Sequence, residues 1–334
     1  MASNIREVAE RAGVATCTVS RVLNGTANVS DKTRSKVEQA MKELNYTPNE
    51  LARRMFQQRS GIIGMLVPSI QHPFFSSLAR YMESRLVEKG YKLLLMSTVG
   101  EDHKETGYSQ ILKSNLVDGV IMAVNLEQSD EYLQSLGKPV VQLDPREGTT
   151  LPYVVADHLE GGRLAAEALA KSGCKHVIHL VDKDEKGVLS YASHRSFMEY
   201  LYYQNVRTVP IGIDWDHLEV ERYVTMATKL LKENPEIDGI MAPDLLAMAF
   251  YKAALRLGRK IPENFAVVAY DGTYVISTSP TDLTTVQQPI EELAKSTVRM
   301  MMDLLHGHGS KAGTWQLQLP VNISYGQSTT RGRM

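Results

Sequence analysis

Apolar side chains in the first twelve residues recur at the spacing of one helix face. These residues are Ile5, Val8, Ala9 and Ala12. Asn4 precedes them and Glu7 follows three residues later, which is the pattern of a capping box at a helix start. Gly13 can adopt the left-handed conformation that ends a helix. The pattern therefore predicts a helix that begins after Asn4 and ends before Gly13.

Two further short helices are predicted before residue 50. The second runs from Thr16 to Leu23 and ends at Asn24-Gly25; its inward side chains are Val19, Val22 and Leu23. The third begins at Ser30 or Asp31; its apolar face consists of Val37, Ala40, Met41 and Leu44. Two short helices that are joined by a tight glycine turn form a helix-turn-helix, so the sequence predicts this motif at its start.

The outward face of the second helix carries small and hydrogen-bonding side chains. They are Thr16, Cys17, Ser20 and Arg21. Small side chains allow a helix to lie deep in the major groove of DNA, and Arg21 can pair with guanine O6 and N7. Thr18 and Ser20 belong to the residue types that contact phosphates and fix the register. The pattern predicts a helix that reads base edges.

A fourth, shorter helical segment follows at about residues 49–57. Thr47-Pro48-Asn49-Glu50 has the pattern of a capping box with proline at the first helical position. A helix of this length is marginal alone in water. Leu51, Ala52, Met55 and Phe56 share one side of it, and Arg53, Arg54 and Arg59 lie elsewhere. The segment is typical of a helix that folds on DNA and inserts an apolar side chain into the minor groove.

From Gly61 onward, short apolar runs alternate with amphipathic stretches. The predicted strands are 62–67, 93–96, 120–124, 140–143, 177–181, 240–242 and 266–270. The predicted helices lie near 75–89, 104–114, 160–171, 190–203, 218–233, 245–257 and 290–305. This alternation indicates parallel sheets that are covered on both faces. The length predicts two such sheets with a cleft between them.

Ligands of open α/β sheets bind beyond the carboxyl ends of the strands, and five side chains stand at such positions. They are Phe74, Phe75, Asp144, Asp244 and Asp271. Aromatic faces suit the C–H face of a sugar, and carboxylates accept hydrogen bonds from hydroxyls. Core packing of the two phenylalanines, turn capping by Asp144 and Asp271, and helix capping by Asp244 remain as alternatives.

Composition limits the class of protein. The chain has 334 residues, of which 43% are hydrophobic, and no apolar run approaches the ~20 residues that span a membrane. The N-terminus lacks the apolar stretch of a signal peptide, and the two cysteines, Cys17 and Cys174, fit a reducing compartment. These features predict a cytoplasmic protein.

Charge is distributed unevenly along the chain. Residues 1–59 hold ten Lys and Arg against six Asp and Glu, a net charge of +4, whereas the remainder holds 27 against 32, a net charge of −5. A basic head on a slightly acidic body favours a polyanion at the head alone.

The sequence predicts no cofactor, no metal and no catalytic residue. It contains neither G-x-G-x-x-G nor G-x-x-x-x-G-K-[ST], and G-x-S-x-G is also absent. A surface loop explains His306 and His308 better than a metal site does.

The head resembles that of the lactose-repressor (LacI/GalR) family, in the stretches IREVAERAGVATCTVSRVLNG and VSDKTRSKVEQAMKELNYTPNELARRM. The resemblance continues through HPFF at 72–75, VDGVIM at 117–122, VVAYDGT at 267–273 and LTTVQQP at 283–289. The order and spacing of these stretches together are highly specific. The AYDGT stretch favours sucrose-type repressors within the family.

The resemblance assigns roles in the head. It implies that Thr16, Cys17 and Arg21 read bases, and that Ala52 and Met55 belong to a hinge helix whose residue 55 intercalates at the operator centre. Met55 replaces the usual leucine, and Ala15 replaces the usual serine before the reading helix. Thr16 is the candidate replacement for this lost cap.

The resemblance also implies a core similar to periplasmic sugar-binding proteins, with Trp215 as an aromatic residue of the cleft; burial of Trp215 in the core is the alternative. Pro243 stands before Asp244 where the family has asparagine. Ser193 occupies the position of the family's effector-binding arginine, and Arg195 lies two residues on, about 200° around a helix. Both Ser193 and Arg195 are kept as candidates.

We therefore predict an N-terminal all-α helix-turn-helix domain and an α/β core of two doubly wound parallel-sheet subdomains. The expected limits are 1–47 for the first domain, 48–59 for the hinge helix, 60–158 with 288–317 for one subdomain, and 159–287 with 318–330 for the other.

The expected function is a homodimeric repressor of a carbohydrate-uptake or catabolic operon, which binds a pseudo-palindromic operator and a small effector, namely a monosaccharide, a disaccharide or a sugar phosphate. Three alternatives remain: a global regulator with a phosphoprotein corepressor, a transport-associated sugar-binding protein, and an enzyme on the same core. An export signal would be required for the second and a catalytic constellation for the third, and the sequence shows neither.

Overall fold

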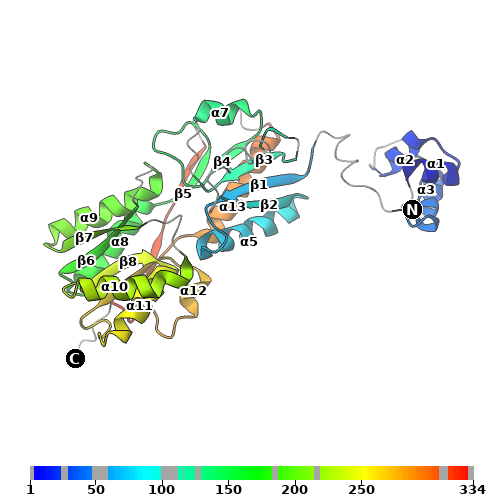
Figure 1. Cartoon of the computed structure of the whole chain (residues 1–334). Helices are drawn as coiled ribbons and strands as arrows, with labels where there is room; N and C mark the ends of the chain where they lie inside the picture. The colour runs from blue at the N-terminus through cyan, green and yellow to red at the C-terminus, as the bar shows by residue number, and fades with distance from the viewer. Residues whose placement is uncertain are drawn as a thin grey trace. The chain divides into compact units, whose positions relative to one another are not determined.

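The computed structural model describes residues 4–23, 29–46, 59–98, 112–114, 116–124, 129–182, 187–213, 219–307 and 315–329. The chain divides into two compact units, Met1–Gly61 and Ile62–Met334, referred to below as the head and the core (Figure 1). The fold class expected from the sequence is confirmed, because the head is helical and the core is α/β. The predicted hinge helix, with Ala52 and Met55, lies outside the described residues, as does the predicted stop at Asn24-Gly25.

The described residues of the head form three helices: α1 (Ile5–Ala12), α2 (Thr16–Leu23) and α3 (Asp31–Glu43). The predicted capping box is present, because Asn4 accepts the amides of Arg6 and Glu7 while the Glu7 carboxylate accepts the amide of Asn4. Gly13 ends α1 with a φ of 65°. The three helices share one core, formed by Val8, Ala9, Ala12, Val19, Val22, Val37 and Ala40.

The start of α2 differs from the expectation that Thr16 replaces the lost cap. The carbonyl of Ala15 accepts hydrogen bonds from the amides of Thr18 and Val19, at 2.8 and 3.3 Å. Ala15 therefore stands at the cap position, and Thr16 is the first residue of the helix. The Thr16 side chain remains exposed on the surface of α2.

The core contains two six-stranded sheets. The first has the order β11-β5-β4-β3-β1-β2 and is parallel throughout. Its strands are β1 (Ile62–Val67), β2 (Lys92–Ser97), β3 (Gly119–Met122), β4 (Val140–Gln142), β5 (Tyr153–Ala156) and β11 (Gln316–Leu319). Helices α5 (Pro73–Glu88) and α13 (Ile290–Leu305) pack against each other beside it, and α7 (Asp130–Ser135) follows β3.

The second sheet has the order β12-β10-β9-β8-β6-β7 and is parallel except for β12. Its strands are β6 (His176–Asp182), β7 (Arg207–Ile213), β8 (Gly239–Pro243), β9 (Ala266–Asp271), β10 (Thr284–Gln287) and β12 (Asn322–Ser324). The paired helices α8 (His158–Lys171) and α9 (Ala192–Tyr203) pack on the sheet, as do α10 (Tyr223–Glu233) and α11 (Asp244–Arg256) (Figure 1). Successive residues of β6, Val177 and Ile178, point to opposite faces of the sheet and belong to different hydrophobic clusters, which shows that both faces are covered.

The chain passes between the two sheets at three short connections. These follow β5, β10 and β11, so that residues 157, 288–289 and 320–321 join the halves of the core. The limits predicted from the sequence lie close to these connections, and the division into subdomains stays a prediction. Three further short helical elements occur in the described residues: the helix α12 (Tyr274–Ser277) and the 3₁₀ turns η1 (Leu189–Tyr191) and η3 (Val220–Arg222).

The N-cap of α3 gives a test of the head's local stability. Ser30 accepts the amide hydrogen of Thr33 through its hydroxyl oxygen. Loss of such a cap costs about 1 kcal/mol, so Ser30→Ala should speed hydrogen exchange of the α3 amides about fivefold. Ser35→Ala makes the same chemical change at an exposed mid-helix position and should not speed exchange. Equal exchange rates in both variants would contradict the capping role.

Candidate functional site

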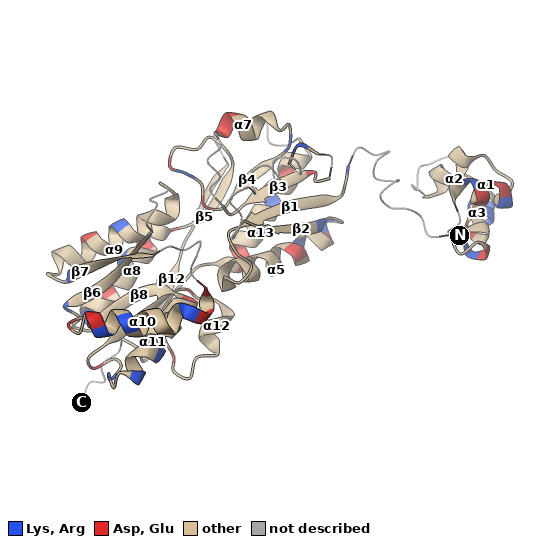
Figure 2. Ribbon diagram, in the orientation of Figure 1, with Lys and Arg blue, Asp and Glu red and all other residues tan. Residues whose placement is uncertain are grey.

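The outward face of α2 is the first candidate site. Thr16, Cys17 and Arg21 are exposed and Thr18 and Ser20 are partly exposed, whereas Val19 and Val22 on the opposite side are buried. Arg21 is the only charged residue of this helix, which is largely tan in Figure 2, while Lys, Arg, Asp and Glu follow α1 and α3. The helix thus presents hydroxyls, a thiol and one guanidinium on a single surface.

The second candidate site is a cavity of about 190 Å³ in the core. It lies at the carboxyl ends of strands from both sheets, where ligands of open α/β sheets bind. Ala123, Asp144 and Ala156 come from the first sheet or the residues after its strands, and Pro243 and Asp271 end strands of the second. The other lining residues are His72, Phe74, Phe75, Leu143, His158, Ser190, Gln288 and Leu293.

Asp144 joins the two halves of the core. Its Oδ1 accepts the amide of Ser190 at 2.9 Å, and its Oδ2 accepts the Ser190 hydroxyl at 2.6 Å. Ser190 belongs to η1, which follows β6 of the second sheet. Burial raises the pKa of Asp144 to about 6 in spite of these two hydrogen bonds. Asp144 therefore lines the cavity and also holds the segment opposite it.

The connection through Asp144 extends into a clasp, defined here as residues 144–147 and 187–190. The carbonyl of Pro145 accepts the amide of Leu189 at 3.0 Å, and the carbonyl of Gly187 accepts the amide of Glu147 at 2.9 Å. Arg146 and Val188 form an isolated antiparallel bridge. These backbone bonds close one side of the cavity.

Asp244 lies behind the cavity rather than in its lining. It is the first residue of α11, and Pro243 holds the cap position, so the helix-capping alternative is wrong. Its carboxylate instead accepts the amides of Gly272 and Thr273, at 3.3 and 2.6 Å, and the Thr273 hydroxyl at 2.6 Å. Burial raises the pKa of Asp244 to about 6. Asp244 thus fixes the turn that follows β9.

Asp271 has one oxygen bonded and one without a partner. Oδ1 accepts the Gln288 side-chain amide at 2.8 Å, and the Asp271 carbonyl accepts the Gln288 backbone amide at 3.0 Å. Oδ2 is buried and has no hydrogen-bond partner among the described residues. The backbone at Asp271 has a φ of 119°, which is strained for any residue except glycine. Burial, together with the charge of Asp244, raises the pKa of Asp271 well above its usual value. An unpaired buried acceptor and local strain in a cavity wall are both typical of a ligand site.

Two phenylalanines form the apolar wall. The rings of Phe74 and Phe75 meet edge to face with centroids 5.2 Å apart, and the His72 ring lies 5.3 Å from that of Phe75. Phe74 and Phe75 are only partly buried and line the cavity, so they are more than packing of the α5 start. Figure 1 places α5 and α13 together at this side of the first sheet.

Two cavity histidines were not predicted from the sequence. His72 caps α5 by accepting the Phe74 amide at Nδ1, and His158 Nδ1 lies 3.1 Å from the Tyr270 hydroxyl. Burial lowers the pKa of each histidine to about 4, so both rings are neutral at pH 7. Ser190 and Gln288 were also missed. HPFF and LTTVQQP contain two of these four residues, but no pattern distinguished them from ordinary loop residues.

The structure does not bring Ser193 and Arg195 into the cavity. Ser193 is buried at the start of α9, and its hydroxyl donates to the Ser190 carbonyl at 2.8 Å. Arg195 is exposed and forms an ion pair of 3.1 Å with Glu147, on the outer side of the clasp. Trp215 lies outside the described residues. Of the predicted effector residues, four therefore meet in the cavity: Phe74, Phe75, Asp144 and Asp271.

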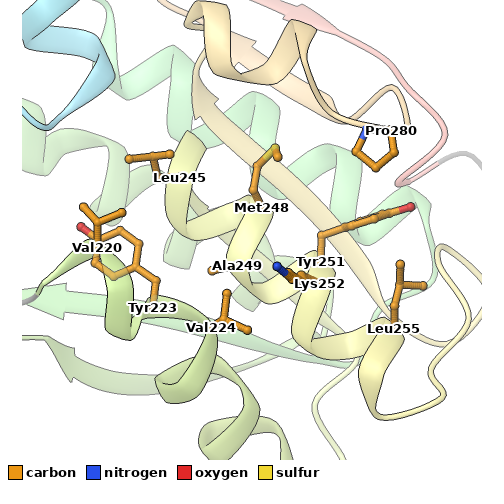
Figure 3. Close-up of a pocket in the computed structure, with 10 residues that line it drawn as sticks. All are labelled: Val220, Tyr223, Val224, Leu245, Met248, Ala249, Tyr251, Lys252, Leu255 and Pro280. Carbon is orange, nitrogen blue, oxygen red and sulfur yellow. The ribbon is translucent and has the colours of Figure 1, made fainter.

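An apolar groove of about 470 Å³ lies on a different surface of the core, between α10 and α11 (Figure 3). Lys252 is the only charged residue in its lining. The other residues are Val220, Tyr223, Val224, Leu245, Met248, Ala249, Tyr251, Leu255 and Pro280. A surface of this composition suits another protein surface better than a small polar ligand.

Within the described parts of the chain, His, Cys, Asp and Glu form no cluster of three or more that suits a metal ion. The helices that the structure describes include none with the length and apolar character needed to cross a membrane.

The raised pKa of Asp144 predicts how the core's stability depends on pH. The folded chain holds this proton more tightly than the unfolded chain, so the free energy of unfolding falls as pH rises from about 4 to about 6. Asp244 and Asp271 act in the same direction.

Asp144→Asn should make this fall shallower by at most about 1.4 kcal/mol per pH unit, as measured by urea unfolding between pH 4 and 7. Asp282→Asn, at an exposed site, is the control. A slope unchanged in Asp144→Asn would show that this carboxyl does not titrate in the window.

Comparisons with known proteins agree with this architecture. Residues 4–49 match the model of bacterial regulatory proteins of the lacI family, and residues 166–329 match a periplasmic binding protein-like domain. The chain is 36% identical to the ribose operon repressor of Halalkalibacterium halodurans over 332 residues, which cover 99% of this chain and 98% of that protein. It is 32% identical to the sucrose operon repressor of Streptococcus mutans, over 98% of this chain and all of the relative.

A solved structure of the Lac repressor dimer, bound to operator and the anti-inducer ONPF, superposes with a TM-score of 0.83. It covers 99% of this chain and all of its own, at 26% sequence identity. Both halves of the chain, the capped helix-turn-helix and the two-sheet core with its cavity, are thus accounted for by a single group of proteins: the chain belongs to the LacI family of bacterial regulatory proteins.

Proposed function

We propose that this protein is a homodimeric repressor that binds a pseudo-palindromic operator and releases or retains it in response to a sugar. The observation that carries the proposal is the pairing of an exposed polar face on α2 with a cavity lined by Phe74, Phe75, Asp144 and Asp271. The two similar proteins reported above are named ribose operon repressor and sucrose operon repressor, so each name states control of a sugar operon. Full-length similarity supports transfer of that role.

In the head, Thr16, Cys17 and Arg21 read base edges, and Thr18 and Ser20 contact phosphates. The exposure of the first three and the burial of Val19 and Val22 support this division. Ala52 and Met55, in the segment between the head and the core, are proposed to contact the minor groove. A two-fold operator requires two heads, which the dimer supplies.

The apolar groove between α10 and α11 supports dimerisation. Tyr223 and Met248 face this groove from the two helices in Figure 3, and Leu255 at its edge is 49% exposed. Contact with a second copy would remove this apolar surface from water. The solved Lac repressor neighbour is itself a dimer.

In the core, the cavity lies where the connections between the sheets pass. Asp271 is bonded to Gln288, which belongs to the connection after β10, and Asp144 is bonded to Ser190 across the clasp. A sugar that binds Asp271 and Phe75 therefore touches elements of both halves and can change the angle between them. The change reaches the DNA through residues 48–59.

We propose no catalytic step for the cavity. The Ser190 hydroxyl donates to Asp144, and the cavity histidines bond to the Phe74 amide and the Tyr270 hydroxyl. Among the described lining residues, no serine or threonine hydroxyl is paired with an imidazole, which is the arrangement that activates such a nucleophile. Regulation rather than chemistry is the role that these contacts support.

Arg21→Ala tests the reading helix. Duplexes bound by the full-length protein are first selected from a random library, and the preferred duplex is compared with one in which the contacted guanine is replaced. Discrimination between the two should fall by about 5- to 150-fold in the variant, since one bidentate contact is worth ~1–3 kcal/mol. Lys36→Ala, on the exposed face of α3, should change affinity for both duplexes alike. Unchanged discrimination in Arg21→Ala would refute the assigned role.

Asp271→Ala tests the cavity. The variant should bind the operator as the wild type does, within twofold, but lose the response to the sugar that shifts wild-type binding. Fluorescence anisotropy of labelled operator with a panel of monosaccharides and disaccharides provides the measurement. Asp282→Ala removes an exposed carboxylate and should respond normally. A normal response by Asp271→Ala would remove this residue from the site.

A further inference from the structure

The ionisable groups that line the cavity are two carboxylates and two neutral imidazoles. Asp144 and Asp271 are the carboxylates, and Asp244 stands directly behind, bonded to the turn after Asp271. His72 and His158 are partly buried and already bonded through Nδ1. Neither Lys nor Arg occurs among the described lining residues. The described lining therefore offers no cation to an anionic ligand.

Two arginines stand near this wall along the chain, Arg146 and Arg195, and neither is among the described lining residues. Arg146 lines a separate pocket together with Glu131 and Glu147. Arg195 pairs with Glu147 outside the clasp, and its side chain is 56% exposed. Ser193 is neutral and its hydroxyl is bonded to the Ser190 carbonyl. A phosphate in the cavity would consequently face carboxylates without a compensating guanidinium, and like charges at close range repel strongly where water is excluded.

The unpaired acceptor indicates what the ligand must supply. Asp271 is 6% exposed, and its Oδ2 has no partner in the described structure. A buried acceptor without a donor is unfavourable, and a ligand hydroxyl at that oxygen would remove the penalty. A phosphate at pH 7 carries acceptor oxygens and negative charge, so it cannot serve there.

The remaining wall suits the C–H face of one ring. The apolar lining residues besides the Phe74–Phe75 pair are Ala123, Leu143, Ala156, Pro243 and Leu293. At about 190 Å³, the cavity is smaller than the ~300–1,000 Å³ that is usual for drug-sized ligands. Size, apolar wall and unpaired acceptor all favour a small ring with several hydroxyls.

From these contacts we propose that the effector is an uncharged monosaccharide and that the cavity rejects the phosphate ester of the same sugar. The inference rests on the proposed sensing function and narrows it, because it selects between free and phosphorylated sugars. The protein then reports the free sugar before any kinase has acted on it.

The test uses the full-length protein and isothermal titration with matched pairs: ribose and ribose 5-phosphate, fructose and fructose 6-phosphate, glucose and glucose 6-phosphate. At least one free sugar should bind, and its ester should bind at least 100-fold more weakly. Asp271→Asn keeps an oxygen that accepts from Gln288 and removes the carboxylate. The ratio of dissociation constants, ester over free sugar, should therefore fall at least tenfold, mainly because the free sugar binds more weakly and the ester more tightly.

Should Asp271→Asn fail to fold, Asp144→Asn provides a second variant at the opposite wall. The ratio of dissociation constants, ester over free sugar, should fall in this variant as well. Asp282→Asn should leave the ratio unchanged. An ester that binds as tightly as its free sugar, or more tightly, overturns the inference while the sensing function stands. An amino sugar that binds more tightly than its parent sugar also overturns the inference, because the preferred effector would then carry a positively charged ammonium group. If neither sugars nor esters bind or alter operator binding, the proposed sensing function itself fails.

Discussion

A buried carboxylate with one unsatisfied oxygen is the constraint on which the core depends. Asp271 ends β9 in a strained backbone conformation, and one oxygen is held by Gln288 on a connection between the two sheets. Asp244 fixes the next two residues, so the carboxylate cannot turn away to find another donor. The backbone strain and the missing hydrogen bond each cost stability, and a donor at Oδ2 would recover the hydrogen bond. A ligand that supplies this donor would therefore contact the connection between the two sheets.

The protein separates two kinds of recognition. We propose that the head recognises sequence with the short helix α2, whose outer face is exposed and whose buried side chains, Val19 and Val22, belong to the shared core of the three helices. We propose that the core binds a small molecule through a few polar groups that stand at the ends of strands. The cavity shares Asp144 with the clasp and Asp271 with a connection between the sheets, so the proposed ligand would contact the residues that join the two halves of the core.

Much of the fold could be predicted from local patterns. Helical spacing and caps located α1, α2, α3 and most core helices, and position at strand ends selected Phe74, Phe75, Asp144 and Asp271, which line the cavity. The edge strands β7, β11 and β12 were missed because their residues alternate between exposed and half-buried and lack the continuous apolar run of a central strand. His72, His158, Ser190 and Gln288 were missed for a different reason: their position in the cavity arises from contacts between segments far apart in the chain, which local periodicity does not encode. For Asp244, sequence position favoured a cap, but tertiary hydrogen bonds to Thr273 determined the role.

The most direct measurement of the central claim is thermodynamic reciprocity between the cavity and the head. Sugar affinity is measured by titration for the free protein and for the protein saturated with operator, and operator affinity is measured with and without saturating sugar. The account predicts that the two ratios are equal and differ clearly from one, because a single movement of the core couples both sites. Sugar that binds the cavity with the same affinity in the presence and absence of operator would contradict it.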